Sequence, residues 1–237
     1  MDLDSILLMF GVMGDIKAVC FDLDGTLCVR DQSDEEVYKA VFDRVEAPAF
    51  FDLDDVYAVD YSSLPKANSD REQYEHVYRA ICRNISADPS YAPTLAEATL
   101  EVLDPTAVSF RDGANKVLEY VQETYAVGLI TAGSEETQLA KVETLGIQDA
   151  FDVTVCCGPG TGIKSKPDPE PFEIALDELG ISFERSIYVG NQHDRDVVGP
   201  QRAGMQTAWV PEKDVSSNPN PEPTFRLSSM REITDIL

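Results

Sequence analysis

A buried strand that runs directly into two acidic residues constrains this chain more than any other feature. Residues 16–21 are mostly apolar and favour a β-strand, and Asp22 and Asp24 follow at once, with Gly25 and Thr26 behind them. Open α/β folds bind ligands at the carboxyl ends of their strands. The two carboxylates are therefore candidates for a functional site. Asp and Gly also form ordinary turns, so this stretch by itself leaves a plain polar turn open.

Short apolar segments alternate with helical patterns through the second half of the chain. Strands are expected at 127–130, 151–156, 186–189 and 206–210. Helices are expected over 112–125, from 135, over 170–179, up to 203 and over 227–237. Strands that alternate with helices form a parallel sheet with helices on both faces. The sequence therefore predicts a Rossmann-like α/β fold.

Residues 30–105 interrupt this alternation with helical patterns and no convincing strand. Ser33 and Glu36 match a capping box at the start of the first helix, and Asp70 is expected to cap a longer one. Two further helices are expected at 52–62 and 95–103. The segment contains 17 acidic and 7 basic residues, which argues against a nucleic-acid platform. We expect a small helical subdomain inserted into the α/β fold.

The charge balance limits the partners of this chain. It carries 43 acidic and 19 basic residues, a formal net charge of -24. Such a surface repels nucleic acid and anionic membranes, so an anionic substrate needs a local positive group or a metal ion. The acidic residues are spread along the chain, which favours a halophilic source, because salt screens the self-repulsion. Stable folding without salt would contradict that hypothesis.

The cysteines favour reduced thiols in a cytoplasmic protein. They are odd in number and lie at positions 20, 28, 82, 156 and 157. The adjacent pair is not spaced like a metal knuckle, and two histidines are too few for a histidine metal cluster. Buried free thiols are therefore expected.

No apolar run approaches the roughly 18 residues of a membrane span. Residues 6–10 are apolar, but the run is short and has no basic flank, so we expect a docking helix rather than a signal peptide. Met13 is an alternative start of the chain.

Three more predicted strands end in polar loops. Thr131 begins one loop just before a helix, Lys166 lies in another between a Gly-rich turn and a proline, and the last contains Asn191, Asp194 and Asp196. In a parallel sheet these loops share one edge with the first acidic pair. Their oxygen ligands, ammonium group and helix amides suit a divalent cation, most simply Mg²⁺, beside a phosphoryl group.

These motifs, in this order, resemble those of the haloacid dehalogenase-like (HAD) hydrolase superfamily, nearer to its phosphoglycolate phosphatase-like members. The matching segments are 22–27, Thr131, 166–169 and 190–205. The resemblance covers nearly everything from residue 15 onward. It implies an α/β core made of 13–29 and 106–237, with 30–105 as a mobile helical cap.

The resemblance also implies a phosphatase that works through an aspartyl-phosphate. Asp22 would be the nucleophile, and Asp24 would protonate the leaving oxygen and then activate water. The implied Mg²⁺ ligands are the Asp22 carboxylate, the backbone carbonyl of Asp24, Asn191 and Asp196.

The same resemblance assigns the remaining loops to the substrate. Thr131 and the amides near Ala132 and Gly133 would hold the phosphoryl oxygens. Lys166 would offset the charge of the phosphoryl group and of Asp22.

One position departs from the family pattern. Asn191 stands where an aspartate is usual, and an amide oxygen can bind Mg²⁺ but brings no charge. We therefore expect a weak metal affinity that Asn191→Asp raises, with Asp194 or Asp196 compensating in part. His193 is expected to be an ordinary loop side chain.

Two alternatives remain open at this stage. A carbon–halogen hydrolase of the same superfamily carries Asn at the position of Asn191, but it usually has Tyr at that of Asp24. A catalytically weak homologue that binds a phosphorylated metabolite or a protein partner is also compatible with Asn191.

The expected partner is a small phosphorylated metabolite, with phosphoglycolate, sugar phosphates and nucleotides all open. No nucleic acid or membrane is expected, and the chain is expected to be a monomer or homodimer. Side chains of the insert that could face the site are Lys66, Arg71, Arg79, Arg83 and tyrosines 57, 61, 74 and 78. A core or solvated position explains each of them more simply.

Overall fold

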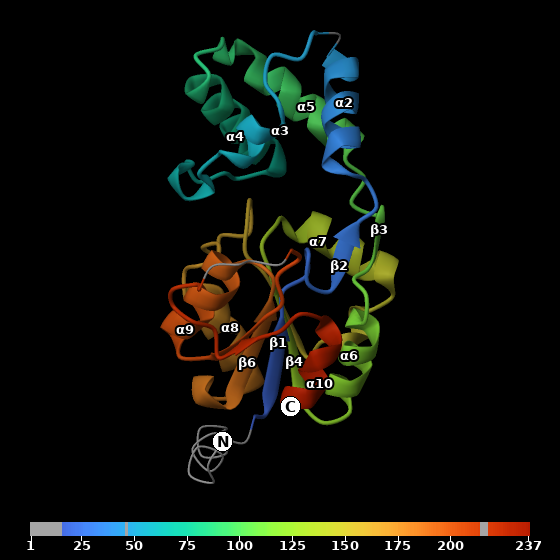
Figure 1. Ribbon diagram of the computed structural model, residues 1–237, viewed down its shortest axis with the longest axis vertical. Helices are drawn as coiled ribbons and strands as arrows, with labels where there is room; N and C mark the ends of the chain where they lie inside the picture. Colours follow the sequence, from blue (N-terminus) through green and yellow to red (C-terminus); the bar gives the residue numbers. More distant parts are fainter. Residues whose placement is uncertain (1–15, 46, 214–217) are drawn as a thin grey trace.

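The computed structural model describes residues 16–45, 47–213 and 218–237 (Figure 1). The docking helix expected at 6–10 and the alternative start at Met13 lie outside these residues. Among the described residues, no helix is long and apolar enough to cross a membrane.

A six-stranded parallel sheet forms the centre of the lower part of the molecule in Figure 1. Its order is β5–β4–β1–β6–β7–β8. The strands are β1 (Ala18–Phe21), β4 (Ala126–Thr131), β5 (Val153–Cys156), β6 (Ser186–Gly190), β7 (Gln206–Trp209) and β8 (Phe225–Arg226). The five expected strands and the parallel α/β class are confirmed. The two-residue strand β8 was not expected, because so short a segment has no readable alternation.

The central strand β1 explains why both faces of the sheet are covered. Its side chains alternate, so that Val19 and Phe21 enter one apolar cluster while Ala18 and Cys20 enter the other. The helices of this domain are α6 (Ala114–Gln122), α7 (Glu135–Leu145), α8 (Glu170–Leu179), α9 (Gly199–Ala203) and α10 (Ile233–Ile236). Figure 1 shows α6 and α10 on one side of the sheet and α8 and α9 on the other.

Four helices form a third apolar cluster above the sheet, and we call this part of the chain the helical insert. They are α2 (Asp34–Val45), α3 (Leu53–Tyr57), α4 (Asp70–Asn84) and α5 (Ala92–Val102). The capping box before α2 is present, because the Glu36 amide donates to Ser33 Oγ and the Ser33 amide donates to the Glu36 carboxylate. The expectation for α4 was wrong by one residue, since Ser69 accepts the capping hydrogen bond.

A two-stranded antiparallel sheet joins the helical insert to the core domain. It pairs β2 (Cys28–Arg30) with β3 (Val108–Phe110), residues that are some 80 positions apart in the sequence. The sequence did not reveal it, because each strand has only three residues. The pair brings both connections of the insert together beside the edge of the sheet where the acidic loop begins.

All five cysteines are buried and free, as expected. Cys20 lies in β1, within one apolar cluster of the sheet, and Cys156 lies in β5. Burial raises the pKa of the Cys20 thiol to about 12, so this group stays protonated at neutral pH.

Arg111, just after β3, ties three chain segments together. Its guanidinium donates to the carbonyls of Gly25 and Val210, both at 2.7 Å, and of Pro211 at 3.1 Å. These carbonyls belong to the loop after β1 and the loop after β7. The position of one loop is therefore fixed relative to the other.

We predict that Arg111→Met lowers the free energy of unfolding by about 2–3 kcal/mol, because partly buried carbonyls lose charge-assisted donors. Denaturant unfolding followed by circular dichroism measures the change. Arg83→Met, at an exposed position of α4, is the control and should change stability by less than about 0.5 kcal/mol. Equal effects of the two substitutions would contradict the role given to Arg111.

Candidate active site

The site begins where β1 ends. The amide of Asp22 donates to the Val189 carbonyl of β6 at 2.9 Å, so the strand register fixes this residue beside β6. The Asp22 carboxylate is buried and accepts two hydrogen bonds, from Lys166 Nζ at 2.8 Å and from Thr26 Oγ1 at 3.0 Å. The first acidic residue of the sequence motif therefore lies within the protein at the sheet edge and not in a solvated turn.

Lys166 reaches this carboxylate from the loop before α8. Its buried ammonium contacts three oxygens: Asp22 Oδ1 at 2.8 Å, Asp196 Oδ1 at 2.9 Å and the Tyr188 hydroxyl at 2.8 Å. The Tyr188 hydroxyl in turn donates to the Ile130 carbonyl at 2.7 Å. Sequence reasoning missed Tyr188, although a tyrosine inside an aliphatic strand needs a partner for its hydroxyl.

Burial and charge shift the proton equilibria of this group in opposite directions. Burial raises the pKa of Asp22 to about 6; Lys166 opposes this shift, and Asp196 adds to it. Burial by itself lowers the pKa of Lys166, but Asp196 and Asp22 together raise it well above its usual range. Lys166 is therefore charged at neutral pH. The ionised form of Asp22 is disfavoured, because burial removes water from its carboxylate.

Asp196 holds the loop after β6 in place. Its Oδ2 accepts the backbone amides of Asn191 at 3.1 Å and Gln192 at 2.8 Å, while Oδ1 accepts from Lys166. A side chain at Gly190 would lie 2.3 Å from the Asp196 Cβ, so only glycine permits this approach. A π-helical turn, Asp194–Val198, replaces the start of the expected helix. Asp196 thus positions Lys166 and the loop, and its role as a metal ligand stays a prediction.

Asn191 lies across the Thr26 hydroxyl from Asp22. Its Oδ1 is 3.4 Å from Thr26 Oγ1, and its backbone carbonyl accepts from Trp209 Nε1 at 2.8 Å. The Asn191 amide oxygen and the Asp22 carboxylate therefore flank the same hydroxyl. Its neighbour in the loop, His193, contacts the Pro221 carbonyl at 2.8 Å, as expected of a loop side chain.

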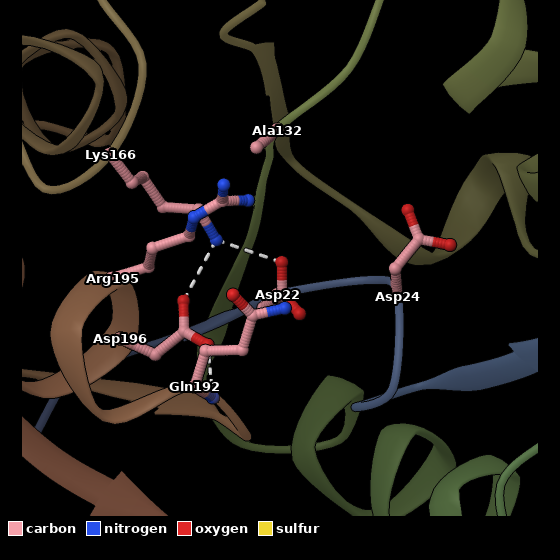
Figure 2. Close-up of a pocket in the computed structure, with 7 residues that line it drawn as sticks. All are labelled: Asp22, Asp24, Ala132, Lys166, Gln192, Arg195 and Asp196. Carbon is pink, nitrogen blue, oxygen red and sulfur yellow. Dashed lines mark hydrogen bonds and ion pairs between the residues drawn. The ribbon is translucent and has the colours of Figure 1, made fainter. Parts of the chain in front are cut away.

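Asp24 is turned away from this group. Its carboxylate accepts from Lys141 Nζ at 2.7 and 2.8 Å and from Gln138 Nε2 at 3.1 Å, both on α7. Figure 2 shows the Asp24 carboxylate pointing away from Asp22 and Lys166, although Asp24 lines the same pocket. Sequence reasoning missed Lys141 and Gln138, which follow no motif. Their three-residue spacing places both on one face of α7.

The loop after β4 presents a buried hydroxyl, that of Thr131. Thr131 Oγ1 is buried, and among the described residues it has no hydrogen-bond partner. Buried hydroxyls are rarely left unpaired, so an absent ligand is a natural partner. Ala132 lines the pocket, and α7 begins at Glu135 after the capping residue Ser134. The loop after β4 therefore reaches the pocket through Ala132.

A small pocket joins these elements (Figure 2). Its lining residues are Asp22, Asp24, Ala132, Lys166, Gln192, Arg195 and Asp196. Gln192 and Arg195 were not expected from the sequence. The Arg195 guanidinium lies 6.0 Å from the ring centroid of Tyr61 in the helical insert. Within the described part of the chain, Arg195 forms no ion pair with a carboxylate.

The other candidates in the insert do not line this pocket. Arg71 pairs with Glu97 and Arg79 with Glu75, and both arginines are exposed. Lys66 and Arg83 are exposed as well. The hydroxyl of Tyr57 donates to Asp34, and that of Tyr78 contacts Thr99. Tyr74 is half-buried on α4. Among these candidate side chains of the insert, Tyr61 alone lies against a residue of the pocket, Arg195.

The chemistry of the donor set fits Mg²⁺, the metal that the sequence resemblance implies. Asp22 and Asn191 present hard oxygen ligands to one space, and the backbone carbonyl of Asp24 follows two residues later. No three His, Cys, Asp or Glu side chains gather into a metal site within the described ranges. A bound Mg²⁺ would therefore use amide, backbone and water oxygens besides one carboxylate, as Mg²⁺ often does.

The parallel sheet carries an ion-paired aspartate, Asp22, at its carboxyl edge. A family model described as haloacid dehalogenase-like hydrolase matches residues 19–210, and the chain belongs to this family. The expected resemblance is thus confirmed, and the chain is an enzyme of the hydrolase type.

A relative from Methanopyrus kandleri, named glyceraldehyde 3-phosphate phosphatase, is 28% identical over 233 residues, which cover 94% of this chain and 97% of the relative.

Two solved structures share the fold. One is a predicted phosphoglycolate phosphatase from Haemophilus somnus, with a TM-score of 0.72 and 16% identity. The other is the putative HAD-hydrolase YfnB from Bacillus subtilis bound to magnesium, with a TM-score of 0.70 and 19% identity. In both comparisons the match covers 94% of this chain and 99% of the other.

The raised pKa of Asp22 leads to a prediction about stability. The native state binds the Asp22 proton more tightly than the unfolded state does. The contribution of Asp22 to the free energy of unfolding therefore falls as pH rises from about 4 to about 6. In metal-free buffer, the free energy of unfolding of Asp22→Asn should therefore increase relative to that of the wild type as pH rises from about 4 to about 6.

Urea unfolding at several pH values in the presence of EDTA measures this difference. Asp177→Asn, at an exposed position of α8, is the matched control and should show no such pH dependence. A difference between Asp22→Asn and the wild type that stays constant from pH 4 to pH 7 would contradict the prediction.

Proposed function

We propose that this chain is a Mg²⁺-dependent phosphatase that hydrolyses a small phosphate monoester through an aspartyl-phosphate on Asp22. The observation that carries the proposal is the buried contact of 2.8 Å between Asp22 and Lys166 in a pocket that also presents Arg195. The carboxylate is a nucleophile, and the two cations suit the phosphoryl group. The phosphatase name of the Methanopyrus kandleri relative supports the same chemistry.

The proposed reaction has two steps. A carboxylate oxygen of Asp22 attacks phosphorus and forms an acyl-phosphate bond, while the bond to the leaving oxygen breaks and Asp24 donates a proton to that oxygen. Asp24 then accepts a proton from water, which attacks phosphorus and releases Asp22 and inorganic phosphate. When bound, Mg²⁺ supplies charge neutralisation between Asp22 and the phosphoryl oxygens. Lys166 and the Thr131 hydroxyl stabilise the developing charge on those oxygens.

Asp24 has to change its rotamer for this role. In the structure its carboxylate is held by Lys141 and Gln138 on α7. Rotation of the side chain would exchange these partners for the leaving oxygen of the substrate.

The helical insert is proposed to act as the cap of this site. Asp70 at the start of α4 accepts from Ser134 Oγ at 2.5 Å and from Thr137 Oγ1 at 2.9 Å, both near the start of α7. Tyr61 of the insert lies over Arg195 of the pocket. These contacts would place the insert over the phosphoryl site, where it excludes water and meets the leaving group.

We expect the purified protein to release p-nitrophenol from p-nitrophenyl phosphate with Mg²⁺, and to lose this activity in EDTA. Asp22→Asn should lower the rate at least about 10³-fold, because no nucleophile remains. The exposed variant Asp177→Asn is the control and should keep the wild-type rate.

The same preparation separates the two alternatives. Metal-independent release of halide from a 2-haloacid would favour a carbon–halogen hydrolase over the proposal. Binding of phosphorylated compounds without turnover of any phosphate monoester would favour a catalytically weak homologue.

Arg195 is proposed to bind the anionic substrate, because its guanidinium lines the pocket without a carboxylate partner among the described residues. Arg195→Ala should lower kcat/KM by about 10- to 100-fold, the value of one charge-assisted hydrogen bond. Arg202→Ala, an exposed position on α9, is the control. Steady-state kinetics measure both, and an unchanged kcat/KM in Arg195→Ala would contradict this role.

A further inference from the structure

Glu212, which no motif includes, contacts the residue that departs from the family pattern. It follows β7 at an exposed position, and its Oε1 accepts a hydrogen bond from Asn191 Nδ2 at 2.9 Å. We propose, on the basis of the metal site of the proposed function, that Glu212 is a positioning residue. It orients the Asn191 carboxamide toward Mg²⁺ and supplies the negative charge that Asn191 lacks.

The orientation follows from the hydrogen-bonding groups involved. A carboxamide has one end that accepts and one end that donates, whereas an ionised carboxylate only accepts. Glu212 therefore binds the Nδ2 end of Asn191, and Oδ1 faces the Thr26 hydroxyl and the Asp22 side of the site. Without Glu212, a half-turn of the amide would present its N–H groups to the cation, which repels them.

The backbone is built to keep this pair together. Arg111 donates to the carbonyls of Val210 and Pro211, immediately before Glu212, and to that of Gly25. The left-handed backbone of Gly25, with φ of 77°, leaves open the space that the pair occupies. A Cβ there would lie 2.1 Å from Glu212 Oε1 and 2.2 Å from Asn191 Nδ2. The acidic motif loop thus accommodates the Asn191–Glu212 contact.

This contact changes the expectation for Asn191→Asp. A carboxylate at position 191 would face the Glu212 carboxylate across the distance now spanned by a hydrogen bond. Electrostatic repulsion would turn one of them away, so the single substitution gains little metal affinity. Combining Asn191→Asp with Glu212→Gln exchanges acid and amide, keeps one hydrogen bond, and places the charge next to the metal.

The test is isothermal titration of the ligand-free full chain with MgCl₂ alone. We expect Glu212→Ala to raise the Kd for Mg²⁺ about 10-fold, as loss of an outer-shell partner does. Glu212→Gln, which keeps an acceptor but not the charge, should give a Kd between those of the wild type and Glu212→Ala. Asn191→Asp with Glu212→Gln should bind Mg²⁺ more tightly than Asn191→Asp alone. Glu222→Ala, which removes the same charge from an exposed position, should bind as the wild type does.

A second readout is available because the chain has one tryptophan, and Trp209 Nε1 donates to the Asn191 carbonyl. Its emission should follow the same MgCl₂ titration and give the same order of Kd values. Wild-type affinity in Glu212→Ala, with clear Mg²⁺ binding by the wild type, would overturn the role of Glu212 and leave the proposed function intact. Failure of the wild type itself to bind Mg²⁺ would overturn the metal dependence of the proposed function, and this inference with it.

Discussion

The ammonium group of Lys166, buried between Asp22, Asp196 and Tyr188, is the interaction on which the site depends. A buried charge without partners costs several kcal/mol, so the fold must bring oxygens to it from β1 and β6 and from the loop after β6. Removal of Lys166 would leave two carboxylates facing each other at the sheet edge. One cation therefore holds Asp22, the proposed nucleophile, beside Asp196 in the turn that follows β6.

The same arrangement explains how a strongly acidic protein can bind an anionic substrate. The chain carries a formal net charge of -24, which repels phosphate esters at long range. Inside the pocket the balance is different, because Lys166 and Arg195 lie beside the Thr131 loop and the start of α7. Local cations in a partly desolvated pocket act more strongly than distant, screened surface charges. Binding of an anion is therefore decided within the pocket.

An element of the fold could be predicted wherever its own residues showed a periodic apolar pattern with clear flanking signals. Helix α8 has the expected bounds, Glu170–Leu179, because its apolar face, the preceding Pro169 and the following Gly180 mark it locally. The β2–β3 pair, β8 and the π-helical turn at Asp194–Val198 were missed. Each is two to five residues long and is stabilised by partners elsewhere in the chain, so it leaves no periodic signal.

By itself, the sequence determined which chemical groups reach the sheet edge, because Asp22 and Asn191 directly follow strands and Thr131 ends one. Only the tertiary structure decided which groups touch. It directs Asp24 to Lys141 and joins Asn191 to Glu212. These contacts depend on strand order and side-chain rotamers across 117 and 21 positions of the chain, which spacing along the sequence does not encode.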